Sequence, residues 1–154
     1  MLGREGENKV IRGGIIFFWW GFWLCSFVDL LLEFGAWQEQ FGSYFSTLGV
    51  DAPVFAGMAI IMVACVQFIA FSFASIALLQ FFLKDGLSTH RYLFSAMFLS
   101  LCLFSLFTFG DVLLGHREEL FRHSIYWLLV VLSWFVYTSS ERELTKLVSR
   151  TLDK

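Results

Sequence analysis

Charged residues and prolines are scarce in this chain of 154 residues, which contains one proline. Charged side chains make up 16% of the sequence and apolar side chains 58%, whereas soluble domains have about 25% and about 45–50%. A soluble helical domain needs a polar face on each surface helix, and the charges here are too few to provide one. We therefore expect a single domain whose surface faces mainly a lipid bilayer.

Several functional signatures are also lacking. The net charge is −2 and no basic tract occurs, which excludes nucleic acid as a partner. Cys25, Cys65 and Cys102 stand alone in apolar runs, and without a C-x-x-C pair they indicate neither a disulfide framework nor a thiol-exchange enzyme. Because no H-x-x-x-H pattern occurs, we expect no metal site. The first apolar run ends in acidic residues without a small-residue cleavage site, so we expect it to be a retained span.

What the chain does contain is four long apolar segments. A membrane-spanning helix needs about 20 apolar residues, and each segment provides one. The predicted fold is therefore an all-α, integral membrane four-helix bundle. The expected spans are residues 13–34, 53–82, 91–112 and 121–140.

The segments between the spans differ in their expected structure. Pro53 suits the first turn of the second span, where its missing N–H removes no hydrogen bond. We expect a loop at 33–50 and a turn at 84–86. Residues 141–154 alternate apolar and charged residues at helical spacing and predict a cytoplasmic amphipathic tail. This tail either lies on the membrane or a partner, or simply continues the fourth helix.

The distribution of basic residues predicts the orientation. The N-terminal segment, the loop after the second span and the C-terminal segment together carry nine Lys and Arg residues. The other two loops carry only Arg117 and Arg122. Because cytoplasmic loops are enriched in Lys and Arg, both termini are predicted to lie in the cytoplasm.

Ionisable residues near the outer ends of the spans are the candidate catalytic residues. An ionisable side chain within a span is costly and is a functional candidate by default. The candidates are Asp29, Asp111, His116 and His123, which together could bind a metal ion, relay protons or hold the head of a quinone. The alternative is that these residues mark hydrated helix ends in the headgroup zone.

Aromatic and amide side chains give a second set of candidates. Trp19 and Trp23 share one face of the first span, and Gln67 lies in the middle of the second. These three residues could bind a quinone ring, although such side chains more often pack against lipid or a neighbouring helix. The three histidines all lie at span ends, so no pair brackets a haem and we expect none.

The order of short motifs resembles the DoxX-like family of small four-helix membrane proteins. The resemblance covers roughly residues 10–140 and is strongest in an F-x-x-L-G-x-x-A-P run. It comprises Arg12-Gly13-Gly14 before the first span, the run 44–53 before the second, the inner turn 84–91, and the outer loop 114–123. Where family members commonly carry a glutamate followed by glycines, this chain has Gln67-Phe68-Ile69-Ala70, so the fold transfers more safely than the chemistry.

The resemblance implies a small integral membrane subunit of a larger assembly, linked to quinone-dependent electron transfer. The alternative function is a non-catalytic accessory subunit at the edge of a membrane complex, and a small transporter ranks third because no charge lies at mid-span. We expect that the chain alone does not catalyse a reaction. If it is part of an enzyme, that enzyme would be a quinone-linked oxidoreductase, and quinone would be the cofactor of this subunit. The expected partners are the lipid bilayer and other membrane-protein subunits, in the cytoplasmic (inner) membrane of a bacterium.

Overall fold

The computed structural model describes the backbone of residues 4–49, 52–83 and 87–152, and the side chains of 6–49, 53–83 and 89–142 among them. All regular structure in these ranges is helical. The helices are α1 (Arg4–Leu32), α2 (Phe34–Thr47), α3 (Ala52–Leu83), α4 (Leu87–Leu114) and α5 (Arg117–Leu152).

Four of these helices are long and apolar enough to cross a membrane. The all-α architecture with four candidate membrane spans is therefore confirmed. A helix suits this environment because all its backbone hydrogen bonds close within the segment, where lipid offers no partner. The spanning segments are Gly6–Leu32, Pro53–Leu83, Thr89–Leu114 and Arg117–Arg142.

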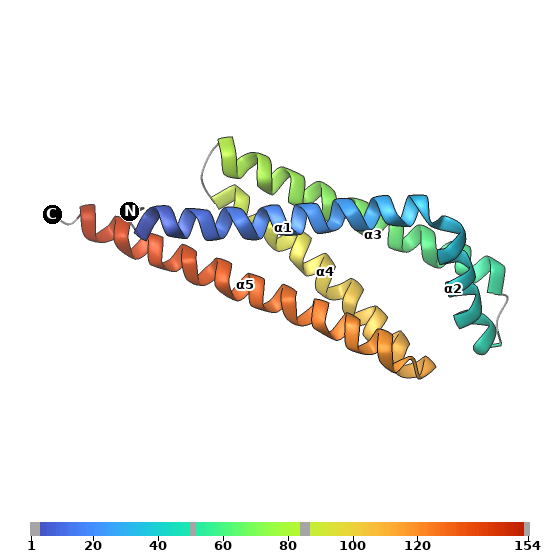
Figure 1. The fold of residues 1–154 in the computed structure, drawn as a ribbon. Helices are drawn as coiled ribbons and strands as arrows, with labels where there is room; N and C mark the ends of the chain where they lie inside the picture. The colour runs from blue at the N-terminus through green and yellow to red at the C-terminus, as the bar shows by residue number, and fades with distance from the viewer. Residues whose placement is uncertain (1–3, 50–51, 84–86, 153–154) are drawn as a thin grey trace.

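Both ends of the chain lie at the same end of the bundle, which we call the termini end (Figure 1). There the Ser140 hydroxyl of α5 donates a hydrogen bond of 3.3 Å to the Asn8 carbonyl of α1. Towards the opposite end, which we call the distal end, α4 and α5 diverge from α1 and α3 (Figure 1). The chain bends after α1, and α2 lies across this distal end.

The start of α3 and the end of α4 are each explained by one residue. Pro53 lies in the first turn of α3, where proline is tolerated because its missing N–H would lack a helical partner in any case. Gly115 ends α4 with a φ of 73°, a left-handed conformation that glycine adopts without a Cβ clash. The turn predicted at 84–86 lies outside the described residues.

The expectation of a loop at 33–50 is wrong, because α2 occupies most of that segment. The tail after the fourth span continues that helix to Leu152, as in the second of the two alternatives. The first helix likewise starts at Arg4, nine residues before the expected span.

Aromatic side chains and hydroxyl groups join the helices in the core. The Trp23 indole N–H donates a buried hydrogen bond of 3.1 Å to Ser100 Oγ, and the Ser100 hydroxyl donates one of 2.7 Å to the Ala96 carbonyl. Trp20 donates similarly to Ser75, at 3.1 Å. These bonds join α1 to α4 and to α3. They also give partners to buried polar groups, which would cost free energy if they were left unpaired.

We predict that Ser100→Ala lowers the free energy of unfolding by about 1 kcal/mol. The Trp23 N–H then loses its acceptor; such a loss costs about 1–3 kcal/mol, and hydrogen bonds within membranes are usually near the low end of that range. Reversible unfolding in mixed detergent micelles measures the change.

The matched control is Ser95→Ala on the same helix. Among the residues whose side chains the structure describes, the Ser95 hydroxyl bonds only to the Arg91 carbonyl of its own turn, so its loss should change the unfolding free energy by clearly less. Equal effects of the two substitutions would contradict the assigned role of the Trp23–Ser100 bond.

Candidate functional site

Asp111 and His123 form a hydrogen-bonded pair near the distal end. Asp111 lies near the end of α4 and His123 in the second turn of α5, and the turn at Gly115 folds α5 back along α4. His123 Nδ1 lies 2.6 Å from Asp111 Oδ2. The side chains are 21% and 7% exposed, respectively, so the contact is largely shielded from solvent and lipid.

This geometry orients the imidazole for proton transfer. When Nδ1–H donates to the Asp111 carboxylate, the Nε2 lone pair remains available to a second partner, and the carboxylate stabilises the imidazolium that forms on protonation. The ring of Phe107 lies against the imidazole, with 4.9 Å between the ring centres. The pair can therefore accept a proton from a bound hydroxyl group or return one.

The Asp111–His123 pair lines a cavity of about 520 Å³, which we call the distal pocket. That volume lies within the range of about 300–1,000 Å³ that is usual for small-molecule sites. Most of its lining is apolar. Its walls are residues of α2 (Trp37, Gln40, Phe41, Tyr44, Phe45), Leu48, residues of α3 (Ala59, Met62, Val63), residues of α4 (Leu103, Leu106, Phe107, Gly110, Asp111, Leu113, Leu114) and residues of α5 (Glu119, Arg122, His123).

Helix α2 covers the distal side of this pocket. Its pocket face carries Trp37, Phe41 and Tyr44 at helical spacing, whereas Gln38 and Glu39 are exposed. The Tyr44 ring lies 4.7 Å from the His116 ring, in the turn before α5. The helix thus presents a mainly aromatic face inward, with Gln40 as its polar member, while Gln38 and Glu39 face outward.

The structure brings together two of the four candidate catalytic residues. Asp111 and His123 are paired, and His116 lies beside them on Tyr44 without lining the pocket. Asp29 is exposed on α1, away from the pocket lining.

The candidate ring-binding residues lie elsewhere. Trp19 and Trp23 are about 1% exposed and belong to the helix-packing core. Gln67 is 5% exposed, and its Oε1 has no hydrogen-bond partner in the described part of the chain. None of the three lines the distal pocket.

The aromatic face of α2 is the part of the site that was not predicted as a binding surface. The spacing of Trp37, Phe41 and Tyr44 already contains the helical signal. Phe107, which packs on His123, was also not singled out, because it lies in a uniformly apolar span.

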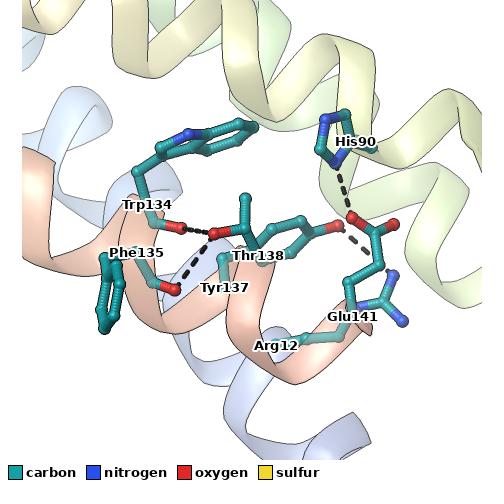
Figure 2. A network of polar contacts seen from close by, with 7 residues as sticks. All are labelled: Arg12, His90, Trp134, Phe135, Tyr137, Thr138 and Glu141. Atoms are coloured by element: carbon teal, nitrogen blue, oxygen red, sulfur yellow. Dashed lines mark hydrogen bonds and ion pairs between the residues drawn. The ribbon is translucent and has the colours of Figure 1, made fainter. Parts of the chain in front are cut away.

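A second polar cluster lies at the termini end (Figure 2). Arg12 is 6% exposed; its Nη2 donates to the Tyr137 hydroxyl at 3.3 Å, and its guanidinium carbon lies 5.2 Å from the centre of that ring. His90 Nδ1 lies 2.8 Å from Glu141 Oε2. The His90 ring also packs on Trp134, at 5.0 Å.

These contacts connect α1, α4 and α5 at one level of the bundle. Figure 2 shows the Arg12 side chain directed from α1 towards Tyr137 and Glu141 of α5, with His90 of α4 on the other side of the carboxylate. Arginine suits such a position because its guanidinium can donate hydrogen bonds and stack on an aromatic ring at once. We assign the cluster a structural role, fastening three helices together.

Neither cluster has the composition of a metal centre. Among the residues with described side chains, no group of three or more His, Cys, Asp or Glu residues is placed to hold a metal ion. The three cysteines are free and exposed on the bundle surface.

Comparison with models of protein families, with curated proteins and with solved structures found no match to the chain.

We predict that Tyr137→Phe lowers the free energy of unfolding by about 1.5 kcal/mol, the lower end of the range for hydrogen bonds to charged groups. The phenyl ring keeps its contact with Arg12 while the hydroxyl acceptor is lost. Unfolding in mixed micelles again provides the measurement.

Tyr92→Phe is the control for this substitution. The Tyr92 ring packs on Phe73, 6.2 Å away, and its hydroxyl group makes no hydrogen bond among the described residues. A loss of stability in the Tyr92 variant as large as in the Tyr137 variant would show that the Arg12 bond adds nothing.

Proposed function

We propose that the chain is a small integral membrane subunit whose distal pocket binds the head of a quinone. The observation that carries the proposal is the Asp111–His123 pair in the wall of an otherwise largely apolar cavity. A quinone needs apolar surroundings for its ring and at least one hydrogen-bonding group at a ring oxygen, and the lining offers both.

A bound quinone would couple the transfer of two electrons to the transfer of two protons. His123 is the residue that would exchange a proton at a ring oxygen through Nε2, since Nδ1 is engaged by Asp111. Asp111 would hold the ring orientation and stabilise the positive charge that the imidazole gains. Phe107 and Tyr44 would border the ring of the quinone, because both line the cavity beside this pair.

The assembly into a larger complex is supported by the surface of α5. Its span is the least buried of the four, and it exposes large apolar side chains, including Phe121, Leu128 and Phe135. A partner subunit on this face would bring the electron donor or acceptor that a quinone reaction requires. The resemblance of the motifs to the DoxX-like family supports the same role.

The same surface favours the second candidate function, a non-catalytic accessory subunit. In that case the α5 face would serve only to pack against its complex, and the distal pocket would hold structural lipid. Purification from native membranes in mild detergent separates the two functions: the accessory role predicts bound protein partners without quinone.

We further propose that the termini end faces the cytoplasm, in the inner membrane of a bacterium. Nine of the eleven Lys and Arg residues belong to the segments at this end, which the positive-inside rule assigns to the cytoplasm. The distal pocket would then lie towards the outer leaflet.

A reporter fusion tests this orientation. Alkaline phosphatase attached after Lys154 should be inactive in cells, because it requires export, whereas green fluorescent protein at the same position should fluoresce. An active phosphatase and a dark fluorescent protein would reverse the proposed topology.

For the pocket, we predict that His123→Gln weakens binding of a decyl-substituted benzoquinone about tenfold, which corresponds to about 1.4 kcal/mol. Glutamine can still bond to Asp111 but cannot exchange a proton as imidazole does. The dissociation constant is measured in nanodiscs by quenching of tryptophan fluorescence.

His116→Gln and Asp29→Asn are the controls, since neither residue lines the pocket. Both should bind the quinone like the wild type. A wild-type protein that binds no quinone, or an Asp29 variant that loses binding while the His123 variant retains it, would refute the proposed function.

A further inference from the structure

The ionisable residues of the distal pocket gather at one end of its lining. Asp111, Glu119, Arg122 and His123 lie towards the distal end, whereas the other end of the lining is wholly apolar. Leu103 marks this deeper end on α4, eight residues before Asp111, a separation of about 12 Å along a helix. The lining therefore matches a molecule with a polar head and an apolar chain, oriented as a membrane lipid is.

The pocket has an apolar open rim between α3 and α4. Met62 on α3 is 52% exposed and Leu106 on α4 is 59% exposed, although both line the cavity. Deeper in the same cavity, Val63 and Leu103 are 1% and 2% exposed. Since both rim residues belong to membrane-spanning segments, this opening faces the hydrocarbon of the bilayer.

The side towards water is covered only in part, because Leu48 and Arg122 of the lining are exposed there. Helix α2 lies across the distal end with Phe41 and Tyr44 directed into the cavity. The two carboxylates of the lining each pair with a cationic or protonatable group, Asp111 with His123 and Glu119 with Arg122 at 3.0 Å. No carboxylate in the lining is thus left to attract a charged head from water.

We propose that the distal pocket is entered sideways from the bilayer, between α3 and α4. Its ligand is therefore a membrane-dissolved amphiphile with an uncharged head and a flexible apolar chain. The inference rests on the proposed quinone-binding function for the identity of the head. The head lies at the Asp111–His123 pair, and the chain leaves past Met62 and Leu106 into the leaflet.

A pair of methionines on α3 provides a matched test. Met62 lines the pocket, whereas Met58 is one turn away, 62% exposed, and does not line it. Met62→Trp fills the sideways opening, and Met58→Trp adds the same bulk beside it. We expect Met62→Trp to weaken binding of the decyl-benzoquinone in nanodiscs about tenfold, while Met58→Trp leaves it unchanged.

The same benzoquinone without its chain serves as the second ligand. Because it has no chain to place in the opening, its binding should change less than about twofold in Met62→Trp, within the scatter of near-neutral substitutions. Equal loss for both ligands, or no loss for either, would overturn the sideways route.

A photocrosslinking experiment tests the opening without any quinone. A photoreactive p-benzoylphenylalanine at Phe107, which lines the pocket, should label acyl chains of nanodisc phospholipids. The same substitution at Phe104, which is 4% exposed in the core and does not line the pocket, should not. Labelling at position 107 should also fall when Met62→Trp is added.

The two experiments separate the two proposals. Lipid labelling at position 107 without any quinone binding by the wild type would overturn the quinone function and support the sideways opening. Quinone binding with neither lipid labelling nor an effect of Met62→Trp would support the function and overturn the opening.

Discussion

The exclusion of water from the bilayer core is the constraint on which the rest of this structure depends. Each backbone N–H and C=O in that region must be paired within the protein, which explains the long helices. The same constraint acts on side chains: the Trp23 N–H is paired with Ser100 and the Trp20 N–H with Ser75. The buried Trp19 N–H and Gln67 Oε1 are exceptions, since neither has a partner among the described residues. The two Trp–Ser pairs are neutral and mid-bundle, whereas the ionisable pairs lie near the two ends.

The two ends satisfy this constraint in different ways. At the termini end, Arg12 and Tyr137 are buried in contact with each other, and His90 pairs with Glu141 beside them. This arrangement joins three helices. At the distal end, the helices diverge, so the Asp111–His123 pair is left in the wall of a cavity. The same kinds of side chain thus fasten helices where they converge and form a candidate binding site where they separate.

The membrane fold could be predicted from the sequence because its signal, a long apolar segment with few charged residues, extends over each whole span. For Asp111 and His123, the sequence predicted only that both residues lie near the same end of the bundle. It did not predict that they form a pair. Their contact depends on the turn at Gly115 and on the direction in which α5 returns along α4. Asp29 is also an acidic residue near the outer end of a predicted span, but it lies on an exposed face of α1. Which face of a helix is buried depends on how the helices pack, and composition does not specify that packing.

Helix α2 accounts for the largest difference between the predicted and observed distal end. Its sequence mixes glycine, glutamine and serine with aromatic residues, and its length of 14 residues is too short for a span. Its fold depends on placing Trp37 and Phe41 against the diverging helices, because an isolated helix of this length is marginal in water. The separation of the long helices at the distal end and the folding of α2 therefore depend on each other. Without α2, the distal end would expose apolar walls to water. Without the separated helices, α2 would have no surface on which to fold.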